Sequence, residues 1–337
     1  MHWSETISRP MPWKEEKNPY LIWLSEIILQ QTRVEQGMPY YLKFAAKYPT
    51  VFDLANVEES ALMKDWEGLG YYSRARNLHE AAKMIVENHQ GIFPKDIYEI
   101  KKLKGIGDYT AAAIASFAYN APFAVLDGNV FRVLSRVFNI ELPIDTTIGK
   151  KYFLSVAQVA LDQQFPAKYN QAIMDFGATH CLPSQPKCQE CVMNEICIAY
   201  QKDIVSILPI KSKKLLKKVR NINYLVYVID DQTLISETTQ SVWKGLFQFP
   251  MVESDKAAWE IEDVQHFLTK EKIGYLTIKK EFADTQNLTH QRINANFWNI
   301  EVIEFPRIEN TKKVSFKNIN NFPYPKIIKN YLSSIHK

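Results

Sequence analysis

Apolar residues follow helical spacing from residue 20 to residue 179, and one segment is apolar on nearly every side. Residues 20–31 run Tyr-Leu-Ile-Trp-Leu-Ser-Glu-Ile-Ile-Leu-Gln-Gln, and a helix that is apolar all round is a buried helix. Before it, Pro10, Pro12 and Pro19 exclude a long helix. The same spacing predicts further helices over 39–48, 57–66, 74–89, 109–119, 128–134, 148–161 and 167–179, and residues 93–104 lead into the helix at 109.

The pattern changes after about residue 207. Residues 222–229, 233–236, 276–282 and 295–305 have the length of strands and are rich in β-branched and aromatic residues. Two helices are predicted among them, near 257–270 and 325–335. We therefore expect an all-α domain over 1–205, a linker over 206–221 and a smaller α+β domain over 222–337.

A tight turn between two helices lies at the centre of the helical part. Leu103-Lys-Gly-Ile-Gly-Asp-Tyr109 places glycines at 105 and 107, and a helix is expected from about Asp108. Glycine permits positive φ and leaves the backbone amides uncovered by a Cβ. Such amides, together with a helix N-terminus, form a site for an anionic oxygen such as a DNA phosphate. An ordinary turn between two helices is the alternative interpretation.

Two carboxylates are candidates for acid–base chemistry. Glu26 lies within the apolar helix, where Ile22 and Trp23 are among its neighbours at helical spacing. A carboxylate in that setting must pair with an arginine, keep its proton or line a cleft. Asp127 precedes the helix that starts at Gly128 and is expected to cap it. Because a helix N-terminus holds an aspartate ionised, a cap and a catalytic carboxylate are compatible roles.

Composition is ordinary for a soluble globular protein, with 46% hydrophobic and 23% charged residues in a chain of 337. There is no apolar run of about 18 residues and no signal-like N-terminus, so neither a membrane span nor a targeting segment is expected. The net charge of +4 does not by itself indicate nucleic-acid binding. One acid-free basic run is either a solvated linker or a phosphate-facing strap. It comprises Lys211, Lys213, Lys214, Lys217, Lys218 and Arg220.

All four cysteines fall in one 17-residue segment, at Cys181, Cys188, Cys191 and Cys197. A single tight cluster indicates a metal site in a reducing cytoplasm rather than disulfides. The spacing C-x6-C-x2-C-x5-C by itself leaves zinc and a [4Fe–4S] cluster equally open.

Several motifs in register resemble the helix-hairpin-helix DNA glycosylases, and among them the adenine DNA glycosylases of the MutY type. The resemblance extends from Pro12-Trp13 to about His290. The motifs are Trp23-Leu24-Ser25-Glu26, Gln30-Gln31-Thr32, Gly68-Leu69-Gly70-Tyr71-Tyr72, Leu103 to Tyr109, Leu126-Asp127-Gly128-Asn129 and the four cysteines.

The resemblance implies a [4Fe–4S] cluster on the cysteines and a Nudix-like fold for the C-terminal domain. It implies that Tyr71 and Gln31 wedge into a duplex while the target base is flipped out. Gly105 and Gly107 would hold the DNA backbone, and Trp13 and Gln171 would line the adenine pocket. Leu288-Thr289-His290 replaces the Phe-Ser-His triplet that senses 8-oxoguanine in the family.

The implied substrate is duplex DNA with adenine opposite 8-oxoguanine or guanine, bound by a monomeric enzyme of the bacterial cytoplasm and nucleoid. Hydrolysis of an N-glycosidic bond needs an acid at the base and an anion near the sugar. Glu26 is the candidate acid and Asp127 the candidate anion, and Tyr109 and Asn129 would position them. Tyr109 stands where endonuclease III enzymes carry a Schiff-base lysine, and Phe131 also replaces a lysine, so strand-cleaving activity is not expected.

Three other functions fit parts of the sequence. A thymine-mismatch or endonuclease III-like glycosylase shares the helix-hairpin-helix, but Glu26 and the C-terminal domain argue against it. A non-catalytic DNA-binding protein would leave Glu26 and Asp127 without a purpose. A Nudix hydrolase would need a Gly-x5-Glu-x7-Arg-Glu-x-x-Glu-Glu run, which the sequence does not contain.

Overall fold

The computed structural model describes residues 1–7, 9–212, 217–239 and 242–335. Contacts divide the chain into two compact units. The first comprises Met1–Asn56 and Asn77–Lys214, and the second comprises Val57–Arg76 and Leu215–Lys337. Residues 57–76, which sequence analysis assigns to the helical domain, thus group with the C-terminal part of the chain. No helix in the described ranges is long and apolar enough to cross a membrane.

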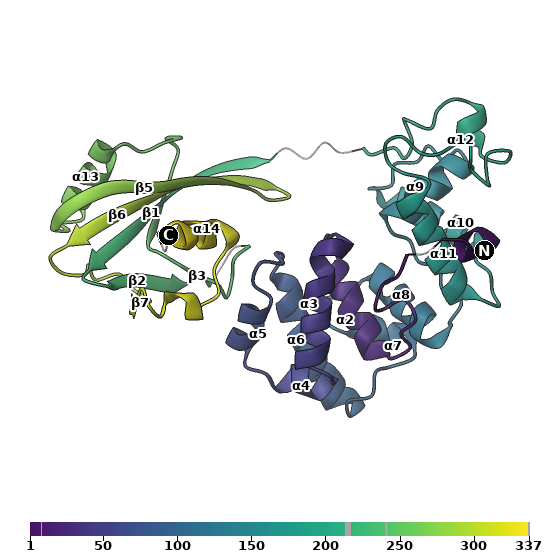
Figure 1. The fold of residues 1–337 in the computed structure, drawn as a ribbon, viewed down its shortest axis with the longest axis horizontal. Coiled ribbons are helices and arrows are strands. Elements are labelled where there is room, and N and C mark those ends of the chain that lie inside the picture. The colour runs from purple at the N-terminus through teal and green to yellow at the C-terminus, as the bar shows by residue number, and fades with distance from the viewer. Residues whose placement is uncertain (8, 213–216, 240–241, 336–337) are drawn as a thin grey trace. The chain divides into compact units, whose positions relative to one another are not determined.

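The first unit is built of helices (Figure 1). They are α1 (His2–Glu5), α2 (Pro19–Leu29), α3 (Val34–Lys47), α4 (Val51–Asn56), α7 (Ile97–Lys102), α8 (Asp108–Tyr119), α9 (Gly128–Val137), α10 (Thr147–Ala160), α11 (Pro166–Thr179) and α12 (Ile198–Gln201). The boundary between the units falls within α6 (Ser73–His89). α2 packs against α3 and α8, and its buried residues include Trp23, Leu24 and Glu26. The prediction of a helix buried on nearly all sides is confirmed.

Several helix boundaries differ from those predicted. α3 begins at Val34, so Pro39 lies inside the helix rather than at its start. A proline at this position has no N–H to donate to the carbonyl four residues earlier, and α3 continues past it with that hydrogen bond missing. α4 was not predicted, and residues 93–104 contain only the six-residue helix α7. Asn18 caps α2 by accepting from the Tyr20 amide, and Pro19 occupies its first turn, as the fixed φ of proline favours.

The second unit contains a mixed sheet with the order β3-β2-β1-β6-β5, while β4 pairs with β1 and β7 with β2. β1 (Lys218–Ile229) and β6 (Gln291–Val302) are parallel, and the other pairs are antiparallel. The remaining elements are β2 (Gln232–Glu237), β3 (Phe247–Gln248), β4 (Met251–Ser254), β5 (Tyr275–Asn287), β7 (Thr311–Ser315), α5 (Glu59–Asp65), α13 (Ile261–Lys270), α14 (Lys326–Ile335) and a 3₁₀ helix at Ile319–Asn321. β1 starts inside the predicted 206–221 linker, and Lys213 and Lys214 of the basic run lie outside the described residues.

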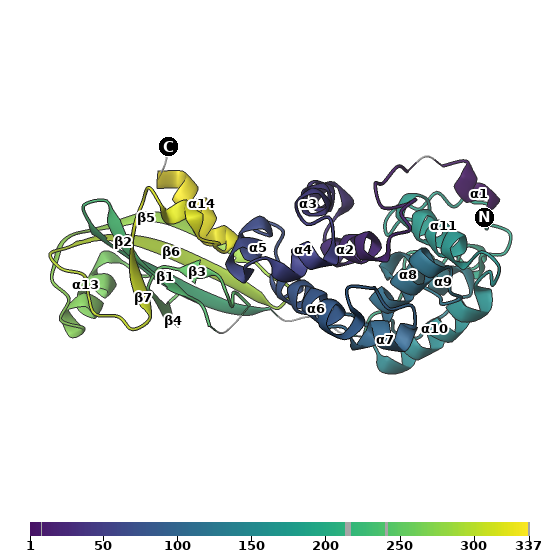
Figure 2. The same cartoon turned by 90° about the horizontal axis from the view of Figure 1, so that it is seen from below.

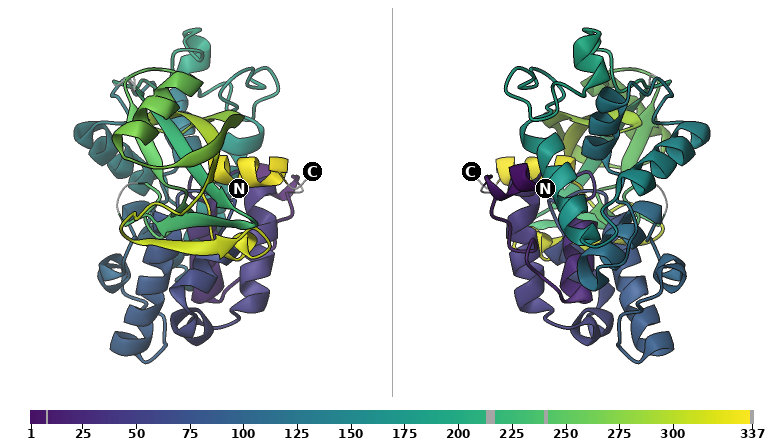
Figure 3. Two further views of the ribbon diagram at one scale, coloured as in Figure 1. Left: turned by 90° about the vertical axis from the view of Figure 1, so that its left-hand side faces the viewer. Right: turned by 90° about the vertical axis from the view of Figure 1, so that its right-hand side faces the viewer.

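Helices cover both faces of this sheet (Figure 3). On one face Tyr224 stacks on Phe297, and Phe297 stacks on Tyr331 of α14 with ring centroids 4.4 Å apart. Side chains alternate along a strand, so Leu225 and Trp298 face the other way, into a core that includes Val264 of α13. The unit is therefore a three-layer α/β structure, and the predicted change from helical to mixed architecture is confirmed.

Candidate active site

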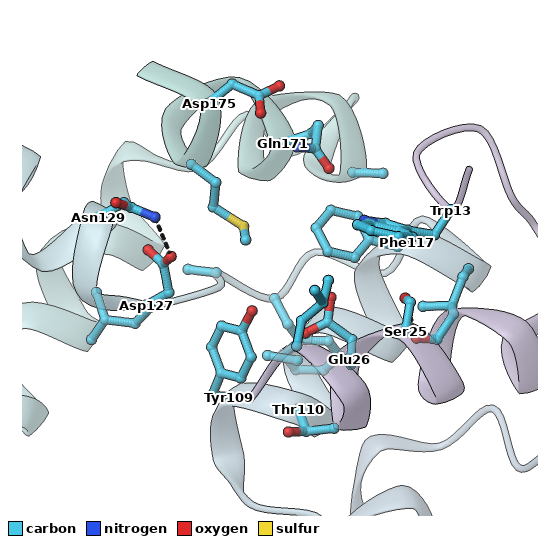
Figure 4. A pocket seen from close by; sticks show the side chains of 18 of the residues that line it. Trp13, Ser25, Glu26, Tyr109, Thr110, Phe117, Asp127, Asn129, Gln171 and Asp175 are labelled. Atoms are coloured by element: carbon cyan, nitrogen blue, oxygen red, sulfur yellow. Dashed lines mark hydrogen bonds between the residues drawn. The ribbon is translucent and has the colours of Figure 1, made fainter. Parts of the chain in front are cut away.

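A cavity of about 1730 Å³ opens in the helical unit. This is larger than the roughly 300–1,000 Å³ of pockets for small ligands, and a nucleotide with part of its backbone would fit. Helices and loops far apart in sequence supply its walls. Glu26 comes from α2, Tyr109 from the start of α8, and Asp127 from the loop before α9 (Figure 4). Asn129, Trp13 and Gln171 also line it, so the structure brings together all six residues that sequence analysis assigned to catalysis and to the base pocket.

Burial sets the protonation of Glu26. Desolvation raises its pKa to about 7 from an ordinary value of 4.5, a hydrogen bond from Tyr109 opposes that rise, and the charge of Asp127 adds to it. The sequence left three possibilities open for Glu26: an ion pair with an arginine, a retained proton or a place in a cleft. The structure supports the last two, because the carboxyl lines the cavity and its raised pKa lets it keep a proton near pH 7. A general acid with a pKa near the working pH transfers protons most effectively.

Asp127 caps α9, as predicted, by accepting from the Val130 amide at 2.7 Å. The hydrogen bonds at the start of α9 are not the largest influence on its pKa. Burial raises the pKa of Asp127 above its usual value, and the hydrogen bonds from Val130 and Asn129 and the charge of Arg132 only partly offset that rise. When it is ionised, this carboxylate lies in a poorly solvated place, where its field acts strongly on any developing positive charge.

Tyr109 stands between the two carboxyls in the first turn of α8. Its side chain is half-buried, and desolvation together with the charges of Glu26 and Asp127 holds its pKa far above the usual range. The hydroxyl therefore stays protonated and donates to Glu26. Figure 4 shows its hydroxyl pointing into the cavity.

Arg132 of α9 belongs to the site and was missed by sequence analysis. Asn129 Nδ2 donates to Asp127 Oδ2 at 2.7 Å, and Asn129 Oδ1 accepts from Arg132 Nη2 at 2.9 Å. The same guanidinium donates to the carbonyl oxygens of Gly177 and Cys181 at 2.6 and 2.7 Å. An arginine among the valines and leucine of α9 was the available signal, since a buried guanidinium must find several acceptors.

Asp175 on α11 holds the N-terminal segment beside the cavity. Its buried carboxylate pairs with Arg9 Nη1 at 2.8 Å and with Lys14 Nζ at 2.7 Å. Next to Lys14, Trp13 packs edge-on against Tyr41 with ring centroids 5.2 Å apart. The two ion pairs thus fix the N-terminal segment that forms one wall of the cavity. No local sequence pattern indicates a contact between residues 9 and 175.

The predicted helix-hairpin-helix turn is present between α7 and α8. Gly105 has φ of +77°, and a Cβ there would meet the side chain of Asn77. Gly107 differs from the prediction, because it caps α8 in an extended conformation with φ of −95°. Its role does not require positive φ. A Cβ at Gly107 would meet nothing within 4 Å, so its bare backbone faces open space at the edge of the cavity.

The residues predicted to contact a duplex divide between the two units. Gln31, Gly105 and Gly107 belong to the first unit. Gln31 is exposed, has φ of +56° and lies just after α2. Leu288, Thr289 and His290 form the turn between β5 and β6 of the second unit, where Leu288 N donates to Gln291 O. Tyr71 belongs to the same unit, and its hydroxyl lies 2.7 Å from Thr289 Oγ1.

The four cysteines line one small cavity with residues of α9 and α11. Burial and the negative charges of the neighbouring cysteines raise the pKa values of Cys188 and Cys191. N–H groups point at the sulfurs, from Arg136 Nη1 to Cys181 Sγ and from the Met193 amide to Cys191 Sγ, each at 3.4 Å. Within the described ranges no three His, Cys, Asp or Glu side chains form a group that could hold a metal ion.

Known proteins match both the helical part and nearly the whole chain. Residues 24–149 match the HhH-GPD superfamily of base excision DNA repair proteins. An adenine DNA glycosylase of Buchnera aphidicola subsp. Baizongia pistaciae is 34% identical over 330 residues, covering 95% of this chain and 90% of the relative. The chain belongs to the adenine DNA glycosylase family. The Mus musculus enzyme of the same name is 39% identical over 211 residues, which are 60% of this chain and 41% of that protein.

Solved structures agree with the family on the helical fold. A thermostable thymine-DNA glycosylase has a TM-score of 0.56 at 30% identity, covering 60% of this chain and 93% of that one. Endonuclease III in a non-covalent DNA complex has a TM-score of 0.50 at 24% identity, covering 56% and 87%. The predicted helix-hairpin-helix glycosylase fold is therefore confirmed, with a further α/β unit toward the C-terminus.

Proposed function

We propose that this family member releases adenine mispaired with 8-oxoguanine or guanine in duplex DNA and leaves an abasic site. The observation that carries the proposal is the pair of carboxyls in one cavity. Glu26 has a pKa raised to about 7, Asp127 is a capped carboxylate, and Tyr109 stands between them. The adenine DNA glycosylases that match most of the chain support the same substrate.

The chemistry follows from the two environments. Protonated Glu26 gives its proton to a ring nitrogen of adenine as the N-glycosidic bond breaks, and the bonding electron pair leaves with the base. The sugar becomes oxocarbenium-like, and the Asp127 carboxylate stabilises its positive charge. Water then adds to the sugar carbon and loses a proton to a carboxylate. The hydrogen bond from Asn129 keeps Asp127 aimed at the sugar.

The other predicted site residues complete the complex. Trp13 and Gln171 line the same cavity as the two carboxyls, which suits them to hold the flipped base. The backbone at Gly105 and Gly107 binds phosphate, and Gln31 and Tyr71 enter the base stack. Leu288, Thr289 and His290 contact the base opposite adenine, from a unit whose layered sheet and helices we assign as Nudix-like.

Base release without strand cleavage is the expected outcome. A lyase needs an amine that attacks the sugar carbon and forms an imine. Tyr109 holds the hairpin position and Phe131 packs on Phe153 at the edge of the cavity, and neither side chain carries an amine. We therefore propose a monofunctional glycosylase. From the family resemblance alone, we also propose that it acts as a monomer in the cytoplasm.

We propose that the four cysteines hold a [4Fe–4S] cluster, although their side chains, as placed among the described residues, do not form a group that could hold a metal ion. The proposal is supported by four thiols that line one cavity and by N–H donors aimed at sulfur, which cluster thiolates need. Cys181, Cys188, Cys191 and Cys197 would hold the cluster, which would supply cross-links that fix this loop. Arg132 and Arg136, which already donate to the carbonyls of Cys181 and Leu182, would anchor the loop on α9.

Single-turnover assays on duplexes that differ in one base pair test the function. We expect adenine release from duplexes with adenine opposite 8-oxoguanine or guanine, none from A:T duplexes, and none with Glu26→Gln. Glu253→Gln, which removes a carboxylate from an ion pair in the second unit, is the matched control and should act like the unmodified protein. Release of thymine from G:T duplexes with adenine left in place would instead favour a thymine-mismatch glycosylase.

A further inference from the structure

Residues 57–76 carry the Gly68–Tyr72 loop and belong to the second unit by their contacts. Figure 2 shows α5 beside α14. The Tyr72 hydroxyl donates to Tyr324 O at 3.2 Å, and Arg76 Nη1 donates to Lys244 O. The loop that bears Tyr71 is thus built onto the C-terminal part of the chain, more than 150 residues away in sequence.

Glu67 is the charged group at the centre of this contact. Its side chain is only 7% exposed, and its carboxylate pairs with Lys329 of α14 at 2.8 Å and with Lys64 of α5 at 3.0 Å. Its other oxygen accepts from the Tyr324 amide at 3.1 Å. Burial alone would raise the pKa of Glu67, but the hydrogen bonds from Lys329, Lys64 and Tyr324 outweigh burial and lower it. The carboxylate is therefore ionised and ties two distant segments together.

The turn that follows Glu67 needs such an anchor, because its backbone is unusual. Gly68, Gly70 and Tyr71 all have positive φ, at 95°, 77° and 49°, and left-handed backbone at a tyrosine is strained. Within the turn, Gly70 O accepts from Trp66 Nε1 at 3.0 Å and from Arg74 Nη2 at 3.1 Å. The result is that Tyr71, 46% exposed, reaches Thr289.

We propose that Glu67 is a positioning residue, which fixes the Gly68–Tyr72 loop on the second unit so that Tyr71 and Thr289 act as one element on the base opposite adenine. The part of this inference that concerns recognition of the opposite base rests on the proposed function, whereas the anchoring of the loop by Glu67 does not. Without the Glu67 carboxylate, the turn loses its ties to Lys329 and the Tyr324 amide. The Tyr71 hydroxyl then no longer meets Thr289 in a fixed geometry.

Hydrogen exchange on the intact protein without DNA tests the anchoring. Glu67→Gln removes the charge, and Lys329→Met removes the partner on α14 while leaving Glu67 and Lys64 in place. We expect amides of residues 66–72 to exchange at least about tenfold faster in both variants, and Glu67→Asp to restore part of the protection. Glu253→Gln, which breaks the pair with Arg220 elsewhere in the unit, should leave residues 66–72 unchanged. Unchanged exchange of these residues in both Glu67→Gln and Lys329→Met would overturn the proposal.

A double-mutant cycle tests the consequence for recognition. The preference for adenine opposite 8-oxoguanine over adenine opposite guanine is measured for Tyr71→Phe, Thr289→Ala and the double variant. We expect the two single effects to be coupled by about threefold or more, and the coupling to vanish when Glu67→Gln is added. Coupling of the same size with and without Glu67 would refute the positioning role. If the unmodified protein releases no adenine, the proposed function fails, while the exchange experiment still decides the anchoring.

Discussion

Glu26→Gln should abolish base release and at the same time stabilise the protein in alkaline solution. In the native state the pKa of Glu26 is about 7, against 4.5 for an ordinary glutamate. Between these values the native state keeps a proton that the unfolded chain has released, so this group's contribution to stability falls as the pH rises from about 4.5 to 7. Above pH 7 the native state bears the cost of a buried, ionised carboxylate.

The size of the effect follows from the pKa difference. Each pKa unit corresponds to about 1.4 kcal/mol, so the cost at pH 8 is about 3 kcal/mol and at pH 5 about 1 kcal/mol. Glutamine keeps the shape and accepts the Tyr109 hydrogen bond but never ionises. Any fixed cost of burying its amide cancels when the two pH values are compared. The variant should therefore gain about 2 kcal/mol more at pH 8 than at pH 5, which is several degrees in the melting temperature of a unit this size.

Denaturant melts of both proteins at pH 5 and pH 8 measure this difference. Glu67→Gln is the control, because the pKa of Glu67 is shifted down whereas that of Glu26 is shifted up. The ionised Glu67 carboxylate already stabilises the folded protein at every pH above about 4.5. The cost of this substitution should change little between pH 5 and pH 8. Adenine release by the unmodified protein should fall as the pH rises through about 7, and Glu26→Gln should lose about 10²–10⁴-fold in rate. If Glu26→Gln gains no more stability at pH 8 than at pH 5, burial is not what sets the protonation of Glu26.

Four further outcomes are expected. Asp127→Asn should reduce base release at least as much as Glu26→Gln yet melt within a few degrees of the unmodified protein, because asparagine caps helices as well as aspartate; a folded, fully active variant would leave Asp127 with a cap role alone. Protein purified without oxygen should hold about four irons per chain, and a single zinc would contradict the cluster. Borohydride during turnover should trap little protein–DNA adduct, since Tyr109 and Phe131 form no imine, whereas trapping as fast as adenine release would reveal an unrecognised amine. Asp175→Asn should lower the free energy of unfolding by roughly 1–3 kcal/mol, which is less than for a fully buried ion pair because Arg9 and Lys14 reach water. The same variant should be cleaved faster by proteases within residues 1–17, and unchanged cleavage would show that other contacts hold this segment.

Local pattern was sufficient for most of the helical unit. The apolar run that became α2 had to be buried whatever packed against it, and Asp127 before Gly128 had to cap α9, since both follow from neighbours within a few positions. The two glycines of the hairpin marked its turn for the same reason, although only Gly105 uses positive φ. The close spacing of the four cysteines predicts a metal site by the same local reasoning, and this stays a prediction.

Tertiary structure decided what depends on burial and on distant partners. The pKa of Asp127 rises although it caps a helix, because desolvation by the packed walls of the cavity exceeds the stabilisation from nearby amides. Arg132 links Asn129 to the cysteine loop only once α9 and α11 are packed together. Glu67 joins its turn to α14 through a residue more than 250 positions away. Sequence periodicity reports which side of an element is apolar, but the solvation of a carboxylate and the partner of a charge are set by chain segments that only folding brings together.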